Sequence, residues 1–549
     1  MQFVFLPTDA VLWAILIALC LAVRHVRRTP ELAQKWRRVF ARPSANASAA
    51  ILAALLVIAA LDSIHYREAL PEARTASGAP AAQAYSPVVK SALDAFVCDM
   101  LRAAGTERSY SAPFALREFD KSTAIVDGAP VRDYQPLQHA GKRIAAYSSR
   151  AATIAKYTLI AAIAGGVTAF VAWLVTAAVV GRRRGRGSLV SGLEIMSNAD
   201  GRFPWRPAMV TGSLLWLLFT WLLLLWPDWH IFGTDAVGND VLYEALKSVR
   251  TAVVIGTLAT FATLPFAITL GIAAGYFKGK VDDVIQYIYT TISSIPSVLL
   301  IAASVLMVTV FLDEHPALYQ TSLERADLKL MLLAVIIGMT GWATLARLLR
   351  AETMKVSTLD FVTAARALGV SHFTIMRRHV LPNVLHIVLI VTVLDFSGIV
   401  LYEAVLSYVG VGVDPAMHSF GTMINSARSE LSRSPMVWWN LAASFVFLLA
   451  IVLPANLFAA AVRDAFDPKA AARSAMALLE RQPDAGEGGA DDADSKAGGT
   501  CEPQRLEAGP RAAAQTGAAA KTKTGKARRP KKGARNAGKA GNAGRGGAA

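Results

Sequence analysis

Residues 359–383 lie between two long apolar segments and read Leu359-Asp-Phe-Val-Thr-Ala-Ala-Arg-Ala-Leu-Gly-Val-Ser-His-Phe-Thr-Ile-Met-Arg-Arg-His-Val-Leu-Pro-Asn383. A connection between two membrane spans needs only to reverse the direction of the chain. This connection instead carries charges and helix signals along its whole length. It is therefore predicted to form a structured platform that docks a soluble partner.

The first half of the loop has the signals of a short helix. Ser357 or Thr358 is expected to be its amino-terminal cap, and Asp360 lies where a negative charge favours the helix dipole. Gly369 suits the left-handed residue that closes a helix. Between these ends, four apolar residues recur at helical spacing and predict one apolar face: Phe361, Ala364, Ala365 and Leu368, with Thr363 beside them.

The second half predicts another helix, capped by Ser371 and stopped by Pro382. Its apolar side would contain Phe373, Met376 and Val380. The alternative to docking is an amphipathic helix pair that packs under the bundle or on lipid headgroups. His372 and His379 are seven residues apart, and we do not expect them to bind a metal.

The composition indicates a membrane protein. Of 549 residues, 54% are hydrophobic and 17% charged, whereas a soluble protein carries about a quarter charged residues. The apolar runs are long enough to cross about 30 Å of hydrocarbon. We predict an all-α polytopic protein with nine spans, at about 8–23, 47–62, 157–180, 208–227, 251–276, 285–308, 329–347, 385–407 and 438–462.

Basic residues are concentrated in every second loop, which predicts the orientation of the spans. Placing these loops in the cytoplasm puts the amino terminus outside and the carboxyl tail inside. The first apolar run is expected to be a retained anchor, because no positive charge precedes it. Pro265, Pro296 and Pro454 lie within predicted spans and are expected to kink them. Cys20, Cys98 and Cys501 would lie in three compartments, so neither a disulfide nor a metal site is expected.

Five regions follow from this pattern. Residues 86–104 have helical spacing, so the external segment that contains them is expected to be a mostly helical module, either a spacer or a partner contact. The low-complexity tail cannot form a core and is expected to be disordered. Its basic end could touch anionic lipid, but nucleic acid is not an expected partner. The regions are 1–62 with two spans and a basic loop, 63–156 as the external module, 157–204 with the third span and a basic linker, 205–466 as a six-span core with loop 348–384, and 467–549 as the tail.

Three motifs resemble those of a known family. Thr363-Ala-Ala-x-x-x-Gly369, followed by His379-x-Leu-Pro382, is similar to the cytoplasmic signature loop of binding-protein-dependent ABC importer permeases, although Thr363 and His379 replace Glu and Ile. The stretch 233–242 resembles an external motif of the second dipeptide or oligopeptide permease, with Asn239 in place of Arg. Its residues of interest are Gly233, Thr234, Asp235, Gly238 and Asp240. The stretches 403–415 and 419–421 resemble that subunit after its fifth core span.

The resemblance covers about residues 205–466 and implies a function. The chain would be the translocation-pore subunit of an ATP-driven importer of the dipeptide, oligopeptide or nickel type, for peptides or a related small solute, in a bacterial inner membrane. Its six-helix core would carry about three extra amino-terminal spans. The implied partners are a homologous second permease, two cytoplasmic ATPases that bind ATP and Mg, and a periplasmic solute-binding protein. The chain itself would be neither an enzyme nor a cofactor carrier.

Two acidic residues leave an alternative open. Asp395 and Glu403 lie in or near the eighth span, where ionisable groups are costly and often functional. Asp395 could line a pathway or titrate in a proton-coupled secondary carrier, or it could simply face a hydrated bundle centre. For Glu403 a structural role is favoured. A membrane scaffold that works through its external module and tail is a further alternative.

Overall fold

The computed structural model describes residues 2–70, 85–100, 106–126, 129–141, 149–183, 193, 205–319 and 321–466. All of them belong to one compact unit, which extends from Met1 to Arg481. The tail predicted to be disordered, 467–549, lies outside the described residues.

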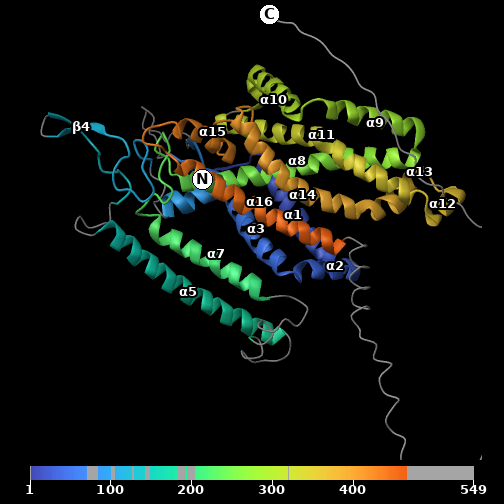
Figure 1. Cartoon of the computed structure of the whole chain (residues 1–549), viewed down its shortest axis with the longest axis horizontal. Coiled ribbons are helices and arrows are strands. Elements are labelled where there is room, and N and C mark those ends of the chain that lie inside the picture. Colours follow the sequence, from blue (N-terminus) through green and yellow to red (C-terminus); the bar gives the residue numbers. More distant parts are fainter. Residues whose placement is uncertain are drawn as a thin grey trace, which may run out of the picture. The chain divides into compact units, whose positions relative to one another are not determined.

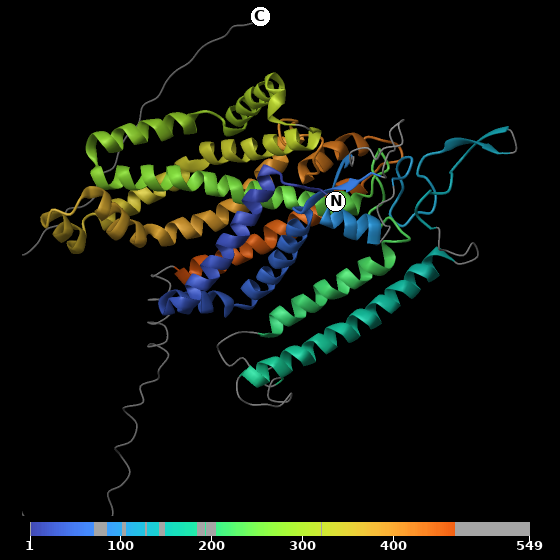
Figure 2. The same cartoon turned by 180° about the vertical axis from the view of Figure 1, so that it is seen from behind.

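Long helices dominate the described structure (Figures 1 and 2). Nine segments in the described residues are long and apolar enough to cross a membrane, which confirms the polytopic all-helical architecture predicted for the spans. They are α1 (Pro7–Arg28), α3 (Pro43–Asp62), α5 (Arg150–Arg183), α7 (Trp205–Leu225), α8 (Val241–Phe277), α10 (Ser297–Glu314), α11 (Ser322–Val356), the continuous segment His372–Tyr408 that ends in α14 (Leu381–Tyr408), and α16 (Trp439–Phe466).

Most predicted spans begin too late. α5 begins at Arg150 rather than near residue 157, and α11 continues to Val356, which shortens the loop that follows it. The sixth predicted span, 285–308, is two helices. α9 (Gly279–Ser294) ends before Pro296, and α10 begins after it. Pro296 therefore separates two helices instead of kinking one, because its ring disfavours helical geometry at the residue before it. Pro265 and Pro454 do lie inside helices.

Helices α8 and α11 form the centre of the bundle, and α14, α16 and α3 pack around them. Glycines allow the central pair to approach closely. A Cβ atom on Gly338 would lie 2.5 Å from the carbonyl oxygen of Ala259, and one on Gly275 would lie 2.6 Å from that of Arg350. Small residues at such crossings let backbones meet in membranes, where packing drives helix association. Helix α7 packs mainly on α5 and α3.

The segment expected to be a mostly helical external module is built largely of strands where it is described. β1 (Gln2–Val4), β2 (His65–Ala69) and β3 (Tyr85–Ser91) form an antiparallel sheet in that order, and β4 (Ser122–Val126) pairs with β5 (Ala129–Asp133). In the described part of the 86–104 stretch, the first residues pair with β2, and the helix is present as α4 (Ala92–Asp94) and the π-helical η1 (Ala95–Met100); residues 101–104 lie outside the described residues. The prediction of a mostly helical module was therefore wrong for the described part of 63–156, although part of the helix within 86–104 is present.

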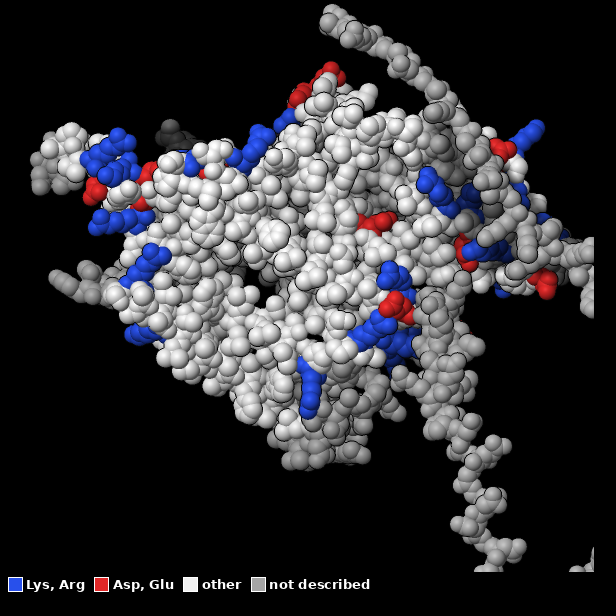
Figure 3. Space-filling model, viewed as in Figure 1, with Lys and Arg blue, Asp and Glu red and all other residues white. Residues whose placement is uncertain are grey.

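The two ends of the bundle can be named by what they carry. The sheet end contains β1 to β3 and the starts of α8, α11 and α16. The loop end contains residues 357–380, with the ends of α8 and α11 and the short helix α2 (Pro30–Phe40). Figure 3 shows a broad belt almost without charge between these ends, with Lys, Arg, Asp and Glu gathered toward both of them. Such a belt is what hydrocarbon requires of the surface it covers.

Candidate functional site

The loop at 357–380 begins with helix α12 (Asp360–Ala367), which has no side-chain cap. Ser357 and Thr358, the predicted caps, instead donate their hydroxyls to the carbonyls of Met354 and Lys355, both at 2.8 Å. They thus close the preceding helix α11, and Leu359 takes the cap position. Asp360 does lie in the first turn, as predicted.

The predicted apolar face of α12 is divided between two sides of the helix. Ala365 turns toward the bundle together with Val362, which is fully buried among residues of α8, α11 and α14. Phe361 and Leu368 point outward with 43% and 84% of their surface exposed. Ala364 and Thr363 are exposed as well. The sequence analysis did not identify Val362 as a buried residue. Val362 and Ala365 form a second apolar face of the helix, and only the contact with the bundle shows that this face is the buried one.

The second half of the loop follows a left-handed turn. Gly369 has φ +76° and nothing within 4 Å of where a Cβ atom would stand. Ser371 caps α13 (His372–Ile375) by accepting a hydrogen bond from the N–H of Thr374, as predicted. Pro382 does not stop the helix, contrary to prediction. A π-helical turn, η3 (Met376–Val380), leads directly into α14, so Pro382 lies in that helix's first turn, where its missing N–H is tolerated.

Side chains connect the loop to the end of α8, and an ion pair joins the neighbouring helices α9 and α11. Tyr276, at the end of α8, contacts Nδ1 of His372 through its hydroxyl at 2.9 Å, and the guanidinium of Arg366 lies over its ring at 5.1 Å. Arg350 near the end of α11 pairs with Asp282 of α9, with Nη2 to Oδ2 at 2.6 Å. Arg366 and His372 therefore join the loop to the end of α8, and Val362 belongs to the same buried cluster as residues of α8, α11 and α14.

At the sheet end, the 233–240 stretch anchors a segment that precedes the core. Thr234 donates its hydroxyl to the carbonyl of Ser109 at 2.8 Å and accepts the N–H of Ser111 at 2.6 Å. The indole of Trp439 donates to the carbonyl of Thr234 at 2.9 Å. Gly233 has φ +69°, and its Cβ would lie 2.3 Å from the carbonyl oxygen of Ser111.

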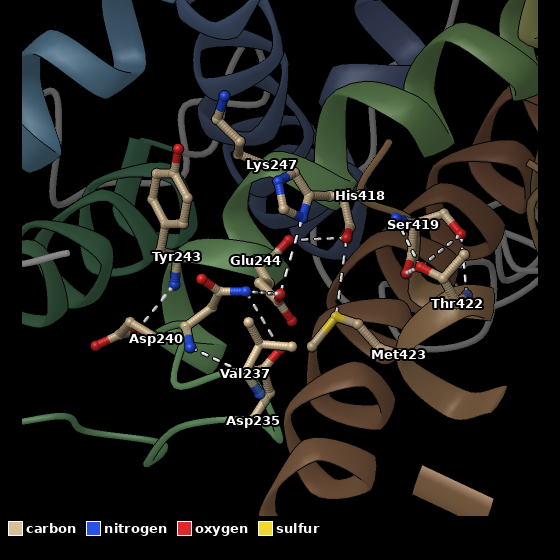
Figure 4. Close-up of polar contacts among 12 residues, drawn as sticks. Asp235, Val237, Asp240, Tyr243, Glu244, Lys247, His418, Ser419, Thr422 and Met423 are labelled. Carbon is tan, nitrogen blue, oxygen red and sulfur yellow. Dashed lines mark hydrogen bonds and ion pairs between the residues drawn. The ribbon is translucent and has the colours of Figure 1, made fainter. Parts of the chain in front are cut away.

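The same stretch forms a tight turn. The carboxylate of Asp235 accepts the N–H groups of Val237 and Asn239 at 2.9 and 2.7 Å. Gly238 has φ +91°, and a Cβ there would lie 2.0 Å from the carbonyl oxygen of Glu107. The motif residues thus serve to bring two chain segments together. Figure 4 shows this turn beside the first residues of α8 and the segment around His418 and Ser419.

Asp240 links the turn to a buried histidine. One carboxylate oxygen caps α8 by accepting the N–H groups of Leu242 and Tyr243, and the other accepts Nδ1–H of His230 at 2.7 Å. Nε2 of His230 lies 3.4 Å from Glu107. The histidine therefore bridges a core carboxylate and a carboxylate of the preceding segment.

This arrangement shifts two pKa values in opposite directions. Burial alone would lower the pKa of His230, but its hydrogen bonds with Asp240 and Glu107 outweigh burial and raise it to about 9. Burial would raise the pKa of Glu107, but its hydrogen bonds lower it to about 2. Besides His230, the donors to Glu107 are the backbone N–H groups of Gln138, His139 and Ala140.

Sequence reasoning missed a buried charge network beside this site. Arg250 of α8 is 3% exposed, and its Nη2 lies 2.6 Å from Asp9 of α1 and 3.4 Å from Asp327 of α11. Asp9 also accepts from Nδ1 of His65, and Asp327 accepts the N–H of Thr8 at 3.0 Å. The sequence did contain a sign of this network, namely ionisable residues inside apolar helices. Burying such residues in a membrane costs free energy unless they pair with one another.

A second pairing lies next to Arg250. Lys247 is 2.9 Å from Asp94 and 3.4 Å from Asp62, and the hydroxyl of Tyr243 donates to Asp94 at 2.6 Å. These groups line a cavity of about 340 Å³ between the first segments of the chain and the core. With Arg250, they join the amino-terminal extension to α8.

The two acidic residues of α14 occupy different surroundings. Glu403 is buried and accepts the hydroxyl of Ser407 at 2.7 Å, one turn further along. Asp395 is half-buried, about two turns before Glu403. Around Ser407 the chain is crowded, because a Cβ on Gly421 would lie 2.3 Å from its Cβ. The stretches 403–415 and 419–421 are thus packed together at the sheet end.

Comparison with known proteins matches residues 267–472 to the family described as binding-protein-dependent transport system inner membrane component. The oligopeptide transport system permease protein OppC of Haemophilus influenzae is 30% identical over 241 residues, which cover 44% of this chain and 71% of that protein. OppC of Escherichia coli is 28% identical over 302 residues, covering 51% and 93%. A solved structure of the MetNI methionine ABC transporter in an inward-facing conformation aligns with 16% identity and a TM-score of 0.32, over 41% of this chain and 97% of that one.

Proposed function

Since this chain belongs to the family of binding-protein-dependent transport system inner membrane components, we propose that it is the translocation-pore subunit of an ATP-driven importer. The family supplies the membrane component of transport systems, and the chain is accordingly a multi-pass membrane protein. Its relatives are oligopeptide and dipeptide permeases. We propose peptides, or a related small solute, as the substrate class.

One observation carries the coupling part of the proposal. Helix α12 exposes Phe361 and Leu368 while Val362 holds it to the bundle. Singly exposed apolar side chains are common, but 84% exposure of a leucine on a helix fixed from its other side suits insertion into a partner's groove. The ties from Arg366 and His372 to Tyr276 would then pass the partner's motion to α8.

The proposed assembly follows from this placement. The loop end would face the cytoplasm and dock one of two ATPase subunits, which bind ATP and Mg. The sheet end would face a periplasmic solute-binding protein, and a homologous second permease would complete the pore. The amino terminus would then be periplasmic. The basic loops support this orientation, because positive charge is retained on the cytoplasmic side.

The coupling role can be tested by ATP-driven uptake of a labelled oligopeptide into proteoliposomes that contain the full transporter. Leu368→Asp should reduce uptake at least about tenfold, since a buried unpaired charge at an interface costs more than about 1.4 kcal/mol. Folding should be unaffected, because Leu368 is exposed. Gly369→Val should have a similar effect by straining the turn at φ +76°.

The matched control is Leu318→Asp. Leu318 is 54% exposed in the turn η2 (Pro316–Leu318), at the opposite end of the bundle. Because that end would face the solute-binding protein, the control is measured by co-purification of the ATPase subunits, which Leu318→Asp should leave at the wild-type level and Leu368→Asp should reduce. Normal uptake by both Leu368→Asp and Gly369→Val would refute the coupling assignment, and so would equal loss of the ATPase subunits in Leu318→Asp and Leu368→Asp.

A further inference from the structure

Helix α2 lies at the loop end, and its apolar face is packed against another helix of the bundle. Leu32, Trp36 and Val39 recur at helical spacing, and they pack against the last turns of α16. The ring of Trp36 lies 5.7 Å from that of Phe466 and 6.4 Å from that of Phe458, centroid to centroid. α2 is therefore held in a fixed place on the bundle and is not a freely moving connection.

The exposed surface around α2 is strongly basic. Within residues 24–40 the only acidic residue is Glu31. Six cationic side chains are exposed there, and in the described part of the chain none of them forms an ion pair with a carboxylate: Arg24, Arg27, Arg28, Lys35, Arg37 and Arg38. By contrast, Arg42 pairs with Asp464 at 2.5 Å. Figure 3 shows blue side chains gathered where α2 and the end of α16 lie.

The position of these charges is set by the two flanking helices. α2 connects α1 to α3, and both are long and apolar enough to cross a membrane. The connection must therefore lie at the membrane surface, whichever side of the membrane that is. Because successive residues of a helix are about 100° apart, Lys35 and Arg37 flank Trp36 on its two sides. Long basic side chains so placed beside an apolar face reach the level of the headgroups.

From this arrangement we propose that α2 and the end of α1 form a binding surface for anionic phospholipid headgroups. Arg27 and Arg28 would contact phosphate from the end of α1, and Lys35, Arg37 and Arg38 from α2. Clusters of four to eight basic residues next to a span are attracted to anionic leaflets. The surface lies outside the residues matched to the family, so this inference does not depend on the proposed function.

A membrane is favoured over an acidic protein partner for a physical reason. A protein partner would need exposed contact area as well as charge, but the apolar side of α2 is covered by α16. What remains accessible is a row of long cationic side chains at headgroup level. Individually mobile phosphates can satisfy such a row without complementary shape.

The test uses the full chain in nanodiscs of phosphatidylcholine with increasing phosphatidylglycerol. Native mass spectrometry then gives the association constant of retained phosphatidylglycerol. The triple variant Lys35→Gln, Arg37→Gln, Arg38→Gln should lower that constant by about 100-fold, at about fivefold per charge, which corresponds to about 1 kcal/mol each. Raising NaCl should weaken binding to the wild-type chain.

The matched control removes three charges at the sheet end: Arg117→Gln, Lys121→Gln and Arg132→Gln, all exposed. It should leave the association constant unchanged. An equal loss in both variants, or in neither, overturns the proposal. Should the first variant fail to insert, the charge-conserving variant Lys35→Arg, Arg37→Lys, Arg38→Lys must still bind, and salt-independent binding by the wild-type chain would also overturn it. Displacement of the lipid by inorganic phosphate at constant ionic strength would assign the surface to soluble anions and overturn it.

Discussion

Replacing Arg250 by methionine should destabilise the fold strongly, because it leaves carboxylates buried without their countercharge. The side chains of Arg250, Asp9 and Asp327 are only 4%, 2% and 0% exposed. Removing one partner of such a buried pair costs about 3–5 kcal/mol. Methionine is close to arginine in length and leaves little cavity. The loss of stability therefore measures the effect of removing the charge and not the effect of removing side-chain volume.

Arg42→Met is the matched control. Arg42 also joins the extension to the core, through Asp464 at 2.5 Å, but these side chains are 46% and 39% exposed. An exposed pair contributes about 0–1 kcal/mol. Both variants therefore remove an arginine that links the same two parts of the chain, and they differ mainly in burial.

The free energy of unfolding can be measured in mixed dodecylmaltoside and SDS micelles by tryptophan fluorescence. Arg250→Met should lose about 3–5 kcal/mol and Arg42→Met no more than about 1 kcal/mol. Adding Asp327→Asn to Arg250→Met should recover part of the loss, since one of the unpaired charges is then removed. Equal losses in the two single variants would refute the view that the buried network holds the extension to α8.

Two further predictions concern the sheet end. The raised pKa of His230 means that its contribution to stability is complete below about pH 6.5 and is lost as the pH rises through about 9. The free energy of unfolding, measured from pH 6 to 10, should show this loss. His230→Gln should flatten the dependence of that free energy on pH. Gly238→Ala should cost more than about 2 kcal/mol, because it combines φ +91° with a Cβ 2.0 Å from a carbonyl oxygen, whereas Gly212→Ala in α7 has open space and should be neutral or stabilising. A wild-type free energy of unfolding that does not fall between pH 6.5 and 10 would contradict the role of His230. Equal losses of stability in Gly238→Ala and Gly212→Ala would contradict the role of Gly238.

Local signals predicted the spans and the helical loop well, since hydropathy, capping and periodicity act over a few residues. Asp360, Gly369 and Ser371 were each placed correctly from neighbours within one turn. Pro382 was misread because a π-helical turn before it lets the helix continue, and no short pattern marks that turn. The loop's apolar face was likewise half wrong, because only the position of α12 on the bundle decides which side is buried.

The sheet and the buried charges depend on residues far apart in the chain. Phe3 pairs with Tyr66, and Tyr66 with Lys90, so no window of helical or strand length contains the pairing. Asp9 and Arg250 are 241 residues apart. Their presence in apolar helices could have been noticed from the sequence, but their pairing could not, because it requires the starts of α1, α8 and α11 to meet.

The amino-terminal extension is part of the packing of the six-span core predicted over 205–466 and is not merely attached to it. α7, the first span of the core predicted over 205–466, packs mainly on α5 and α3, which both precede it. α3 also contacts α8 and α16, so it lies between α7 and the rest of the core. At the sheet end, Arg250 binds α1 to α8 and α11 in one buried cluster. Any motion of α8 driven from the loop end must therefore move the extension with it or break those ion pairs, and their burial makes the first course the less costly one.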